Sequence, residues 1–231
     1  MMKARNKEHA AVPQPGPFTV RDCALVVLAT GHSATSLREL RDDLLLVDQS
    51  SIYHHFWGRL LQPQFDEPEY SNDFASWAFH ELHDSILAER LSAIDPSDYD
   101  QLEELRSAII DLIEIRLDDG DRAVWNQADE PFYFTRSQIV VFDAHVQADT
   151  PAMLAQLLPS FSSGSIFYHF IEARRRPPVP LDDFSAWLLA YGEQYSQLLG
   201  RLVNIDPFFS SLLKIQQTLV ALFKESIESR E

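Results

Sequence analysis

Two histidines hold matching positions in a hexapeptide that occurs twice, and their side chains are the ones best suited to chemistry. The copies are Ser51-Ile52-Tyr53-His54-His55-Phe56 and Ser165-Ile166-Phe167-Tyr168-His169-Phe170, which align His55 with His169. Neutral imidazoles are good ligands for zinc, copper and iron. If the fold brings His55 and His169 together, they could hold a transition metal or a small ligand, with Tyr53 as a further ligand contact.

The alternative is that each of these histidines is half-buried on a helix and bonded to a backbone carbonyl or a nearby acid. A zinc site needs three or four ligands, and the sequence offers only two that match. His54 is replaced by Tyr168 in the second copy, which makes it a poorer candidate for a symmetric role. His32 and His145 match by position and could extend the set, although solvated turn positions explain them better.

A second histidine pair, His80 and His83, has i, i+3 spacing, which would place both side chains on one face of a helix. Metalloprotease helices carry His-Glu-x-x-His with i, i+4 spacing, so this segment does not match them. It also has no counterpart in the second half of the chain. A metal site here is therefore the weaker hypothesis.

Two tryptophans follow aspartates at the same spacing in both halves. Asp73 and Trp77 recur as Asp183 and Trp187, and an aromatic ring beside a carboxylate is suited to binding sugars. The alternative is structural, because Phe-x-x-Trp spacing is typical of a buried helix face and the acids are expected to cap the helices. The sequence favours the structural interpretation, with Trp77 and Trp187 kept as candidate ligand-binding residues.

Arg174, Arg175 and Arg176 form a cationic cluster at the end of the second hexapeptide helix. Arginine binds phosphate and carboxylate groups well, and cations also stabilise a helix C-terminus. A solvated helix end is the simpler explanation, and a binding patch that uses Arg174 and Arg175 is the alternative. The sequence lacks a phosphate-binding glycine loop, a Gly-x-Ser-x-Gly elbow and a Cys-x-x-Cys pair, so no catalytic signature accompanies the cluster.

Charge and composition limit the class of partner. The 231 residues include 19 basic and 35 acidic side chains, a formal net charge of −16, which disfavours nucleic acid. Residues 18–117 carry 7 basic and 19 acidic side chains, whereas residues 132–224 carry 7 of each. The second half is thus better suited to an acidic or apolar partner, unless the charges only drifted. No apolar run is long enough for a membrane span, and the single Cys23 fits a reducing cytoplasm.

The elements that must position these side chains also recur. Each half opens with a segment that starts at Phe18 or Phe132 and contains β-branched or aromatic residues, which favours a strand most clearly in the second half. A helix follows near Ser36, where Ser36 and Glu39 have capping-box spacing. In the second half Thr150 is the expected cap, followed by proline at the first helical position.

Four further helices and three sequence motifs complete each half. Ser50 or Ser51, and Ser165 in the second copy, are expected to cap the hexapeptide helices. The next helix carries Asp-Phe-x-x-Trp, the fourth ends at Ile-Asp-Pro, and a fifth follows. The copies are 114 residues apart at the hexapeptide (165 − 51), 110 at Asp-Phe-x-x-Trp (183 − 73) and 111 at Ile-Asp-Pro (206 − 95). Three motifs in one order predict an internal duplication.

The predicted fold is therefore mainly α, with two homologous helical repeats of about five helices each, a pseudo-twofold axis and room for a short strand at the start of each repeat. Because amphipathic helices must bury their apolar faces, the simplest arrangement packs the repeats face to face, as in a fused dimer. Whether the repeats share one core stays open. The expected boundaries are 1–17 for a disordered tail, 18–117 for repeat 1, 118–131 for an acidic linker, 132–224 for repeat 2 and 225–231 for a tail.

These motifs carry a resemblance to a known family. Gly31-His32 with Leu37-Arg38-Glu39-Leu40, the first hexapeptide, Asn72-Asp73-Phe74 with Trp77, and residues 165–176 together resemble an uncharacterised prokaryotic family catalogued as a domain of unknown function. The resemblance covers nearly all of residues 18–224. It implies a soluble bacterial or archaeal protein, and it supplies no activity, cofactor or site residue.

The leading functional hypothesis is a non-catalytic binding or assembly module, because a duplicated scaffold is present without a catalytic constellation. The alternative is a metal-dependent enzyme or small-ligand binder that uses His55 and His169 at a cleft between the repeats. A cytoplasmic protein with a protein partner, and with neither nucleic acid nor membrane as partner, is expected. Whether a reaction is catalysed and which oligomer forms are left open.

Overall fold

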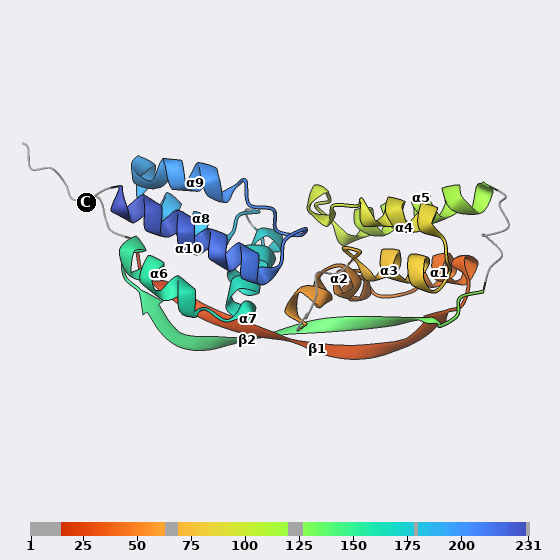
Figure 1. Ribbon diagram of the computed structural model, residues 1–231. Helices are drawn as coiled ribbons and strands as arrows, with labels where there is room; N and C mark the ends of the chain where they lie inside the picture. The colour runs from red at the N-terminus through yellow and green to blue at the C-terminus, as the bar shows by residue number, and fades with distance from the viewer. Residues whose placement is uncertain (1–14, 63–68, 120–126, 178–179, 230–231) are drawn as a thin grey trace, which may run out of the picture.

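The computed structural model describes residues 15–62, 69–119, 127–177 and 180–229. In this part the chain is mainly helical, as predicted, and its two long strands form one antiparallel sheet. Figure 1 shows the helices as two groups that lie side by side along the two-stranded ribbon.

The ribbon consists of β1 (Phe18–Ala34) and β2 (Phe132–Ala148), each 17 residues long. Phe18 lies opposite Ala148 at one end, and Ala34 lies opposite Phe132 at the other. The strands are much longer than the short segments expected from the sequence, because each continues beneath both groups of helices. Extended backbone over this length suits the many β-branched and aromatic residues of β2.

Two bulges interrupt the pairing, one in β1 around Gly31 and one in β2 around His145. Both residues have a positive φ, 85° for Gly31 and 56° for His145, as bulges with a left-handed residue require. The sequence paired His145 with His32. The backbone instead gives His145 and Gly31 the same role, so His32 and His145 are not equivalent.

Each strand is flanked by five α-helices that follow it in the chain. The first unit contains α1 (Leu37–Leu44), α2 (Gln49–Trp57), α3 (Asp73–His80), α4 (Ser85–Ser92) and α5 (Leu102–Asp118). The second unit contains α6 (Pro151–Leu157), α7 (Ser163–Ile166), α8 (Asp183–Leu189), α9 (Ser196–Leu202) and α10 (Leu212–Glu228). A π-helical turn (Phe167–Ile171) and a 3-10 turn (Glu172–Arg175) continue α7.

Each strand begins against the helices of the other unit. The start of β1 packs on the second unit, and the start of β2 packs on the first unit. Phe18 of β1 stacks on Phe184 of α8 with ring centroids 5.2 Å apart. Phe132 of β2 stacks on Phe74 of α3 at 5.1 Å. β1 then reaches α1, and β2 reaches α6. The two units are thus joined by exchanged strands, and neither unit's core is complete without the strand that precedes the other unit.

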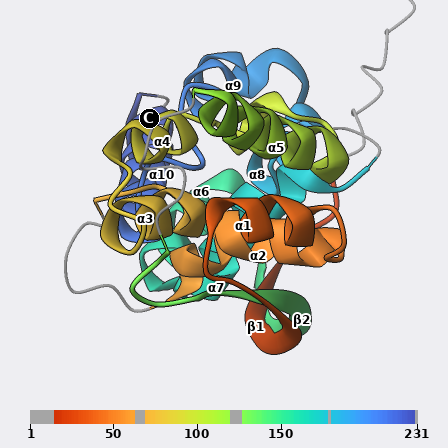
Figure 2. The same ribbon diagram turned by 90° about the vertical axis from the view of Figure 1, so that its right-hand side faces the viewer.

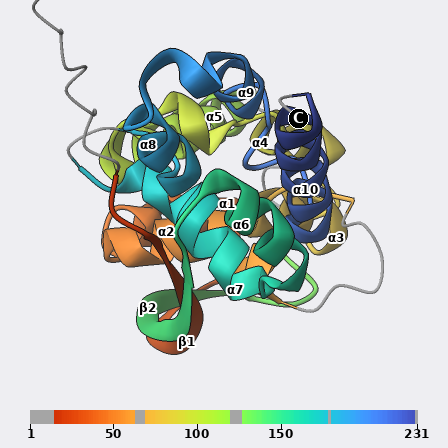
Figure 3. The ribbon, with the colours of Figure 1, turned by 90° about the vertical axis from the view of Figure 1, so that its left-hand side faces the viewer.

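One continuous apolar core runs through both units. Phe208, just before α10, lies with its ring centroid 5.9 Å from Phe56 and 6.2 Å from Trp57 of α2. The units therefore share a core, a point that the sequence left open. They lie side by side along the ribbon rather than face to face as expected, and views from either end show the helices on one side of it (Figure 2 and Figure 3).

The serines of the hexapeptides do not cap the helices as predicted. Asp48 is the N-cap of α2 and Ser162 is the N-cap of α7. Ser51 is fully buried, and its hydroxyl donates to the backbone carbonyl of Thr135 in β2 at 2.7 Å. Ser165 is buried as well, inside α7. Both helices start about one turn earlier than expected, because residues upstream of the motif supply the caps.

Gly164 allows α7 to approach β1 closely. Its carbonyl accepts the Cys23 thiol at 3.3 Å, and a Cβ at this position would overlap the Cys23 carbonyl oxygen and the Asp22 carboxylate. Cys23 is buried, and burial raises the pKa of its thiol to about 12. This contact fixes the second unit on the ribbon.

Two predicted boundaries differ from the observed elements. α5 continues to Asp118 and α10 to Glu228, beyond the expected ends at 117 and 224. Most of the predicted tail 1–17, residues 120–126 of the predicted linker and residues 230–231 lie outside the described residues. Among the described helices, none has the length and apolar character needed to cross a membrane.

Candidate ligand-binding cleft

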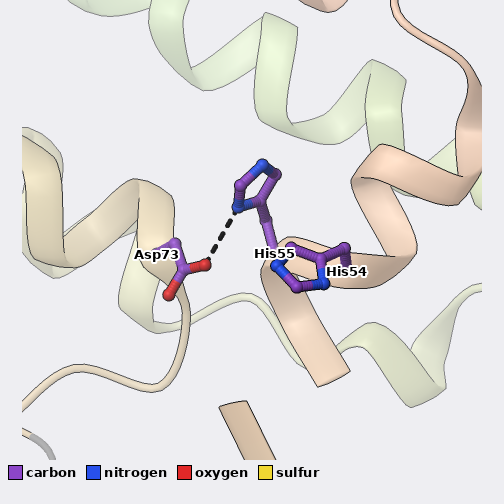
Figure 4. Close-up of side chains that lie close together, drawn as sticks. All are labelled: His54, His55 and Asp73. Carbon is purple, nitrogen blue, oxygen red and sulfur yellow. Dashed lines mark hydrogen bonds and ion pairs between the residues drawn. The ribbon is translucent and has the colours of Figure 1, made fainter. Parts of the chain in front are cut away.

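His55 connects α3 to the ribbon. Its Nδ1–H donates to Asp73 Oδ2 at 2.9 Å (Figure 4), and its Nε2 accepts the backbone N–H of Thr135 at 3.2 Å. The ring is 3% exposed and lies 4.7 Å from the ring of Phe132. Both ring nitrogens are therefore engaged within the protein.

His169 makes the same contacts in the second unit. Its Nδ1–H donates to Asp183 Oδ2 at 2.7 Å, and its Nε2 accepts the backbone N–H of Arg21 at 2.8 Å. Arg21 lies in β1, whereas the residue opposite Thr135 is Ala29, eight residues further along (29 − 21). At about 3.3 Å per residue, the two contacts are about 26 Å apart along the strand. The structure thus does not bring His55 and His169 to a common ligand or metal.

Asp73 and Asp183 do not cap α3 and α8, contrary to the prediction. The caps are the preceding residues, Asn72 and Asp182, whose side chains accept backbone N–H groups of the first turn. Asp73 and Asp183 are the first helical residues, and their carboxylates accept from the histidines instead. The sequence analysis selected these aspartates correctly. It predicted that they accept backbone N–H groups of their helices, whereas they accept from the histidines.

His54, His55 and Asp73 are close enough to hold a metal, because one ligand atom from each lies within 4.8 Å of the others (Figure 4). Within the described ranges no group forms a hydrogen bond with the buried His54 Nδ1, and burial, followed by the neighbouring His55, lowers the pKa of His54. However, a metal bound at His55 Nδ1 would have to displace the hydrogen bond to Asp73. The second unit has Tyr168 in place of His54 and repeats the Asp–His contact without a third ligand.

The two tryptophans hold the chain where it enters each strand. Trp77 Nε1 donates to the carbonyl of Glu130 at 2.9 Å, and Trp187 Nε1 donates to the carbonyl of Gly16 at 2.8 Å. Trp77 is buried, as the structural interpretation predicted. Trp187 and Asp183 line only a shallow depression of about 280 Å³. The arrangement anchors the strands and does not form matching sugar clefts.

The four other histidines in the described part of the chain lie near separate acids. The pairs are His32–Asp43, His80–Glu69, His83–Asp129 and His145–Asp143. His83 lies beyond the end of α3 with a φ of 57°, so it does not share a helix face with His80 as predicted. These histidines do not extend the set around His55 and His169.

A cleft of about 650 Å³ lies where the two units meet. The first unit contributes Gln49 and Trp57 of α2 and the segment 96–102 that leads into α5. The second unit contributes the arginine cluster, Ile171 and three prolines, among them Pro207. This volume is typical of small-molecule sites, which span about 300–1,000 Å³.

Two of the cleft arginines have carboxylate partners in α8 or at its cap. Arg174 lies over the Phe170 ring at 4.2 Å and has Nη2 3.5 Å from Asp182 Oδ2. Arg176 donates to Asp183 Oδ2 at 2.7 Å. Burial lowers the pKa of Arg174 and raises that of Asp182. This pair and the Arg176–Asp183 pair tie the arginine segment to α8.

Arg175 is arranged differently. Its guanidinium lies 4.3 Å from the Trp57 ring centroid and 5.4 Å from that of Tyr53, so it stacks against the first unit. Behind it, the Tyr53 hydroxyl donates to Glu172 Oε2 at 2.7 Å. Burial raises the pKa of Glu172, and it lowers the pKa of Arg175. Trp57, Tyr53, Glu172 and Arg175 thus form a contact between the units, and Trp57 and Arg175 of this contact line the cleft.

Of the predicted site residues, Arg174 and Arg175 line the cleft and Tyr53 lies directly against Arg175. The sequence missed Trp57 and Glu172. Trp57 immediately follows the first hexapeptide, and Glu172 lies in the matching stretch after the second. Their positions next to the repeated motif were the available signal, although nothing local indicated that they would meet.

The model of a family of unknown function, DUF5752, matches residues 15–224. The chain belongs to DUF5752. This confirms the predicted membership in an uncharacterised family. The DUF5752 chain also resembles the solved structure of OrfY from Thermoproteus tenax, with 26% sequence identity and a TM-score of 0.77 over 93% of this chain and 97% of that chain. A search of curated proteins found no match.

Proposed function

We propose that this DUF5752 protein is a non-catalytic binding module whose ligand site is the cleft between its two helical units. The observation that carries the proposal is the cleft itself, with a volume of about 650 Å³ and walls from both units. Ligand sites commonly form at such junctions, because two walls meet there without filling the space between them.

The state of the histidines supports a role without catalysis. A general base needs a free ring nitrogen within reach of the substrate. In His55 and His169 one nitrogen donates to an aspartate and the other accepts a backbone N–H of the ribbon. Both rings are buried and neither lines the cleft, so their role in this proposal is structural.

The proposal includes an origin by internal duplication. It is supported by the pairs of contacts that recur in both units: aspartate to histidine to ribbon, and tryptophan Nε1 to the segment before each strand. A duplicated unit that exchanges its first strand would create a junction between copies. In this interpretation the junction became the ligand site, in a cytoplasmic protein.

The alternative, a metal-dependent enzyme or ligand binder that uses paired histidines at the cleft, has less support, because His55 and His169 contact the ribbon about 26 Å apart. His54, His55 and Asp73 form the remaining arrangement suited to a metal among the described residues. Elemental analysis of untagged protein separates the two. We expect no stoichiometric zinc, copper or iron. One equivalent of metal in the wild type that is absent from His54→Gln would favour the metal-dependent alternative.

Native mass spectrometry of the protein isolated gently from its source cells tests the cleft. We expect a bound small molecule that is released on denaturation. Gln49 lines the cleft and is exposed, so Gln49→Trp should fill part of the space and remove the bound species.

The matched control is Gln194→Trp, which introduces the same side chain at an exposed position outside the cleft. It should retain the bound species. The proposal is contradicted if the isolated chain carries no bound species. It is also contradicted if the bound species survives in Gln49→Trp.

A further inference from the structure

We infer that the ligand of the cleft carries a compact oxyanion, a carboxylate or a phosphate group, and that Arg175 is the residue that binds it. This inference rests on the proposed function, because it concerns the same cleft. It adds the chemical class of the ligand and names the side chain that recognises it.

Three consecutive arginines line the cleft, and two of them have a carboxylate partner. Arg174 and Arg176 each lie within 4 Å of an aspartate carboxylate, Asp182 and Asp183 respectively. Among the described residues, Arg175 forms neither a hydrogen bond nor an ion pair within 4 Å. Its guanidinium donors are therefore available to a group that enters the cleft.

The stacking of Arg175 orients those donors. Arg175 Cζ lies over the Trp57 ring, 4.3 Å from its centroid, and 5.4 Å from the centroid of the Tyr53 ring, which stacks on Trp57. A stacked guanidinium keeps its edge free, and that edge presents parallel N–H donors that match two oxygens of a carboxylate or phosphate. Little conformational entropy is lost on binding, because the side chain is already held.

Glu172, the acid whose charge acts on Arg175, does not neutralise it by a direct ion pair. Glu172 accepts the Tyr53 hydroxyl at 2.7 Å and acts on Arg175 only from beyond ion-pair distance. Burial disfavours the charged form of Arg175, so an incoming anion would compensate a guanidinium that has been partly removed from water. On the opposite wall, Asp100 is exposed to solvent.

The charge of the whole chain limits the size of the anion. A formal net charge of −16 repels extended polyanions, whereas a single oxyanion can reach a local cation. One wall of the cleft belongs to the second unit, and residues 132–224 carry 7 basic and 7 acidic side chains. A small molecule or a short peptide terminus with one anionic group is compatible with the negative net charge of the chain and with the balanced charge of the second unit.

The test follows the Nε–H resonance of Arg175 in ¹⁵N-labelled protein, assigned by its absence in Arg175→Lys. Inorganic phosphate and sodium acetate are titrated separately, which distinguishes the two oxyanions, and sodium chloride at equal ionic strength controls for screening. We expect a saturable shift with phosphate, acetate or both, and none with chloride. Arg175→Gln should weaken binding, measured by calorimetry, at least tenfold.

Arg201→Gln is the matched control. It removes the same charge from an exposed residue that pairs with Glu225 outside the cleft, and it should leave binding unchanged. Far-ultraviolet circular dichroism confirms that Arg175→Gln is folded, and Arg175→Lys, which keeps the charge, should bind with intermediate affinity.

Absence of any saturable shift, an equal shift with chloride, or unchanged binding by Arg175→Gln would each overturn the inference. A neutral species found in the cleft by mass spectrometry and retained by Arg175→Gln would leave the binding module standing while this inference fails.

Discussion

Each Asp–His pair resembles a catalytic pair, but its histidine binds a backbone N–H of a strand and so holds that strand in place. In each unit the aspartate holds Nδ1 protonated, which leaves Nε2 to accept a backbone N–H. In a two-stranded ribbon each strand has an edge without a neighbouring strand, so its outward N–H groups need partners. His55 and His169 supply one such partner each, to Thr135 and Arg21.

His169→Ala should lower the free energy of unfolding by about 2–4 kcal/mol, because it leaves the Arg21 N–H and the Asp183 carboxylate without this partner and opens a cavity. His145→Gly is the contrasting change, since His145 is exposed and has a φ of 56° that glycine adopts freely. It should leave stability unchanged or raise it by about 1 kcal/mol. Urea unfolding measures both. Equal stability of His169→Ala and the wild type would contradict the anchoring role.

Cys23 should be almost unreactive in the folded protein. Burial raises the pKa of its thiol to about 12, so very little of the thiol is ionised to the reactive thiolate at pH 8. Ellman's reagent should therefore modify Cys23 at least about a hundredfold more slowly in native protein than in urea. Rapid modification without denaturant would indicate that α7 detaches readily from the ribbon.

At the scale of elements, close packing between α7 and β1 depends on Gly164. The helix backbone approaches the strand so closely that Cys23 donates its thiol to the Gly164 carbonyl. The ribbon is held at its other end by Ser51, whose hydroxyl donates to the Thr135 carbonyl. Small side chains on the helix face toward the ribbon therefore let each helix dock on a strand from a distant part of the sequence.

Gly164→Ala should destabilise the protein by about 1–3 kcal/mol, because the added methyl group meets strand backbone that cannot move aside. Gly200→Ala is the matched control within α9, where an added Cβ meets nothing within 4 Å. It should stabilise the protein by about 0.5–1 kcal/mol through helix propensity. Thermal unfolding monitored by circular dichroism compares them, and a similar effect of both changes would argue against the close approach.

At the scale of the whole molecule, the two units are coupled by the shared core and by a hydrogen bond beside Arg175. Tyr53 of the first unit donates to Glu172 of the second at 2.7 Å. Burial raises the pKa of Glu172, and the Tyr53 hydroxyl partly offsets that rise. The charged form of Glu172 therefore costs stability, and this cost increases as pH rises through the raised pKa of the folded state.

Tyr53→Phe should lower the free energy of unfolding by about 1–2 kcal/mol at pH 7.5, because Glu172 loses the hydrogen bond to its charged form. The loss should be smaller at pH 5, because the variant raises the pKa of Glu172 further and more of the carboxyl is protonated there. Tyr168→Phe is the control, since its hydroxyl accepts from Arg176, a group that does not titrate in this range. Urea unfolding at both pH values should show a pH-dependent penalty for Tyr53→Phe alone, and equal penalties at the two pH values would count against the coupling.

The sequence by itself determined the local structure of this protein. Helical periodicity and stop signals predicted a mainly α fold with about five helices in each half, and Thr150 with Pro151 marked the start of α6 correctly. Where local signals competed, the prediction erred by about a turn, as for the helices that Asp48 and Ser162 cap. Membership in an uncharacterised family was also readable from the motifs.

The tertiary structure alone decided how these elements meet. The contact between His169 and Arg21 joins residues 148 positions apart, and that between His55 and Thr135 joins residues 80 apart. Periodicity and capping act over a few residues, so they do not show which strand a helix will pack against. The exchange of strands separated the two histidines that the repeated motif had paired, and it placed Arg175 against Trp57 to form the cleft.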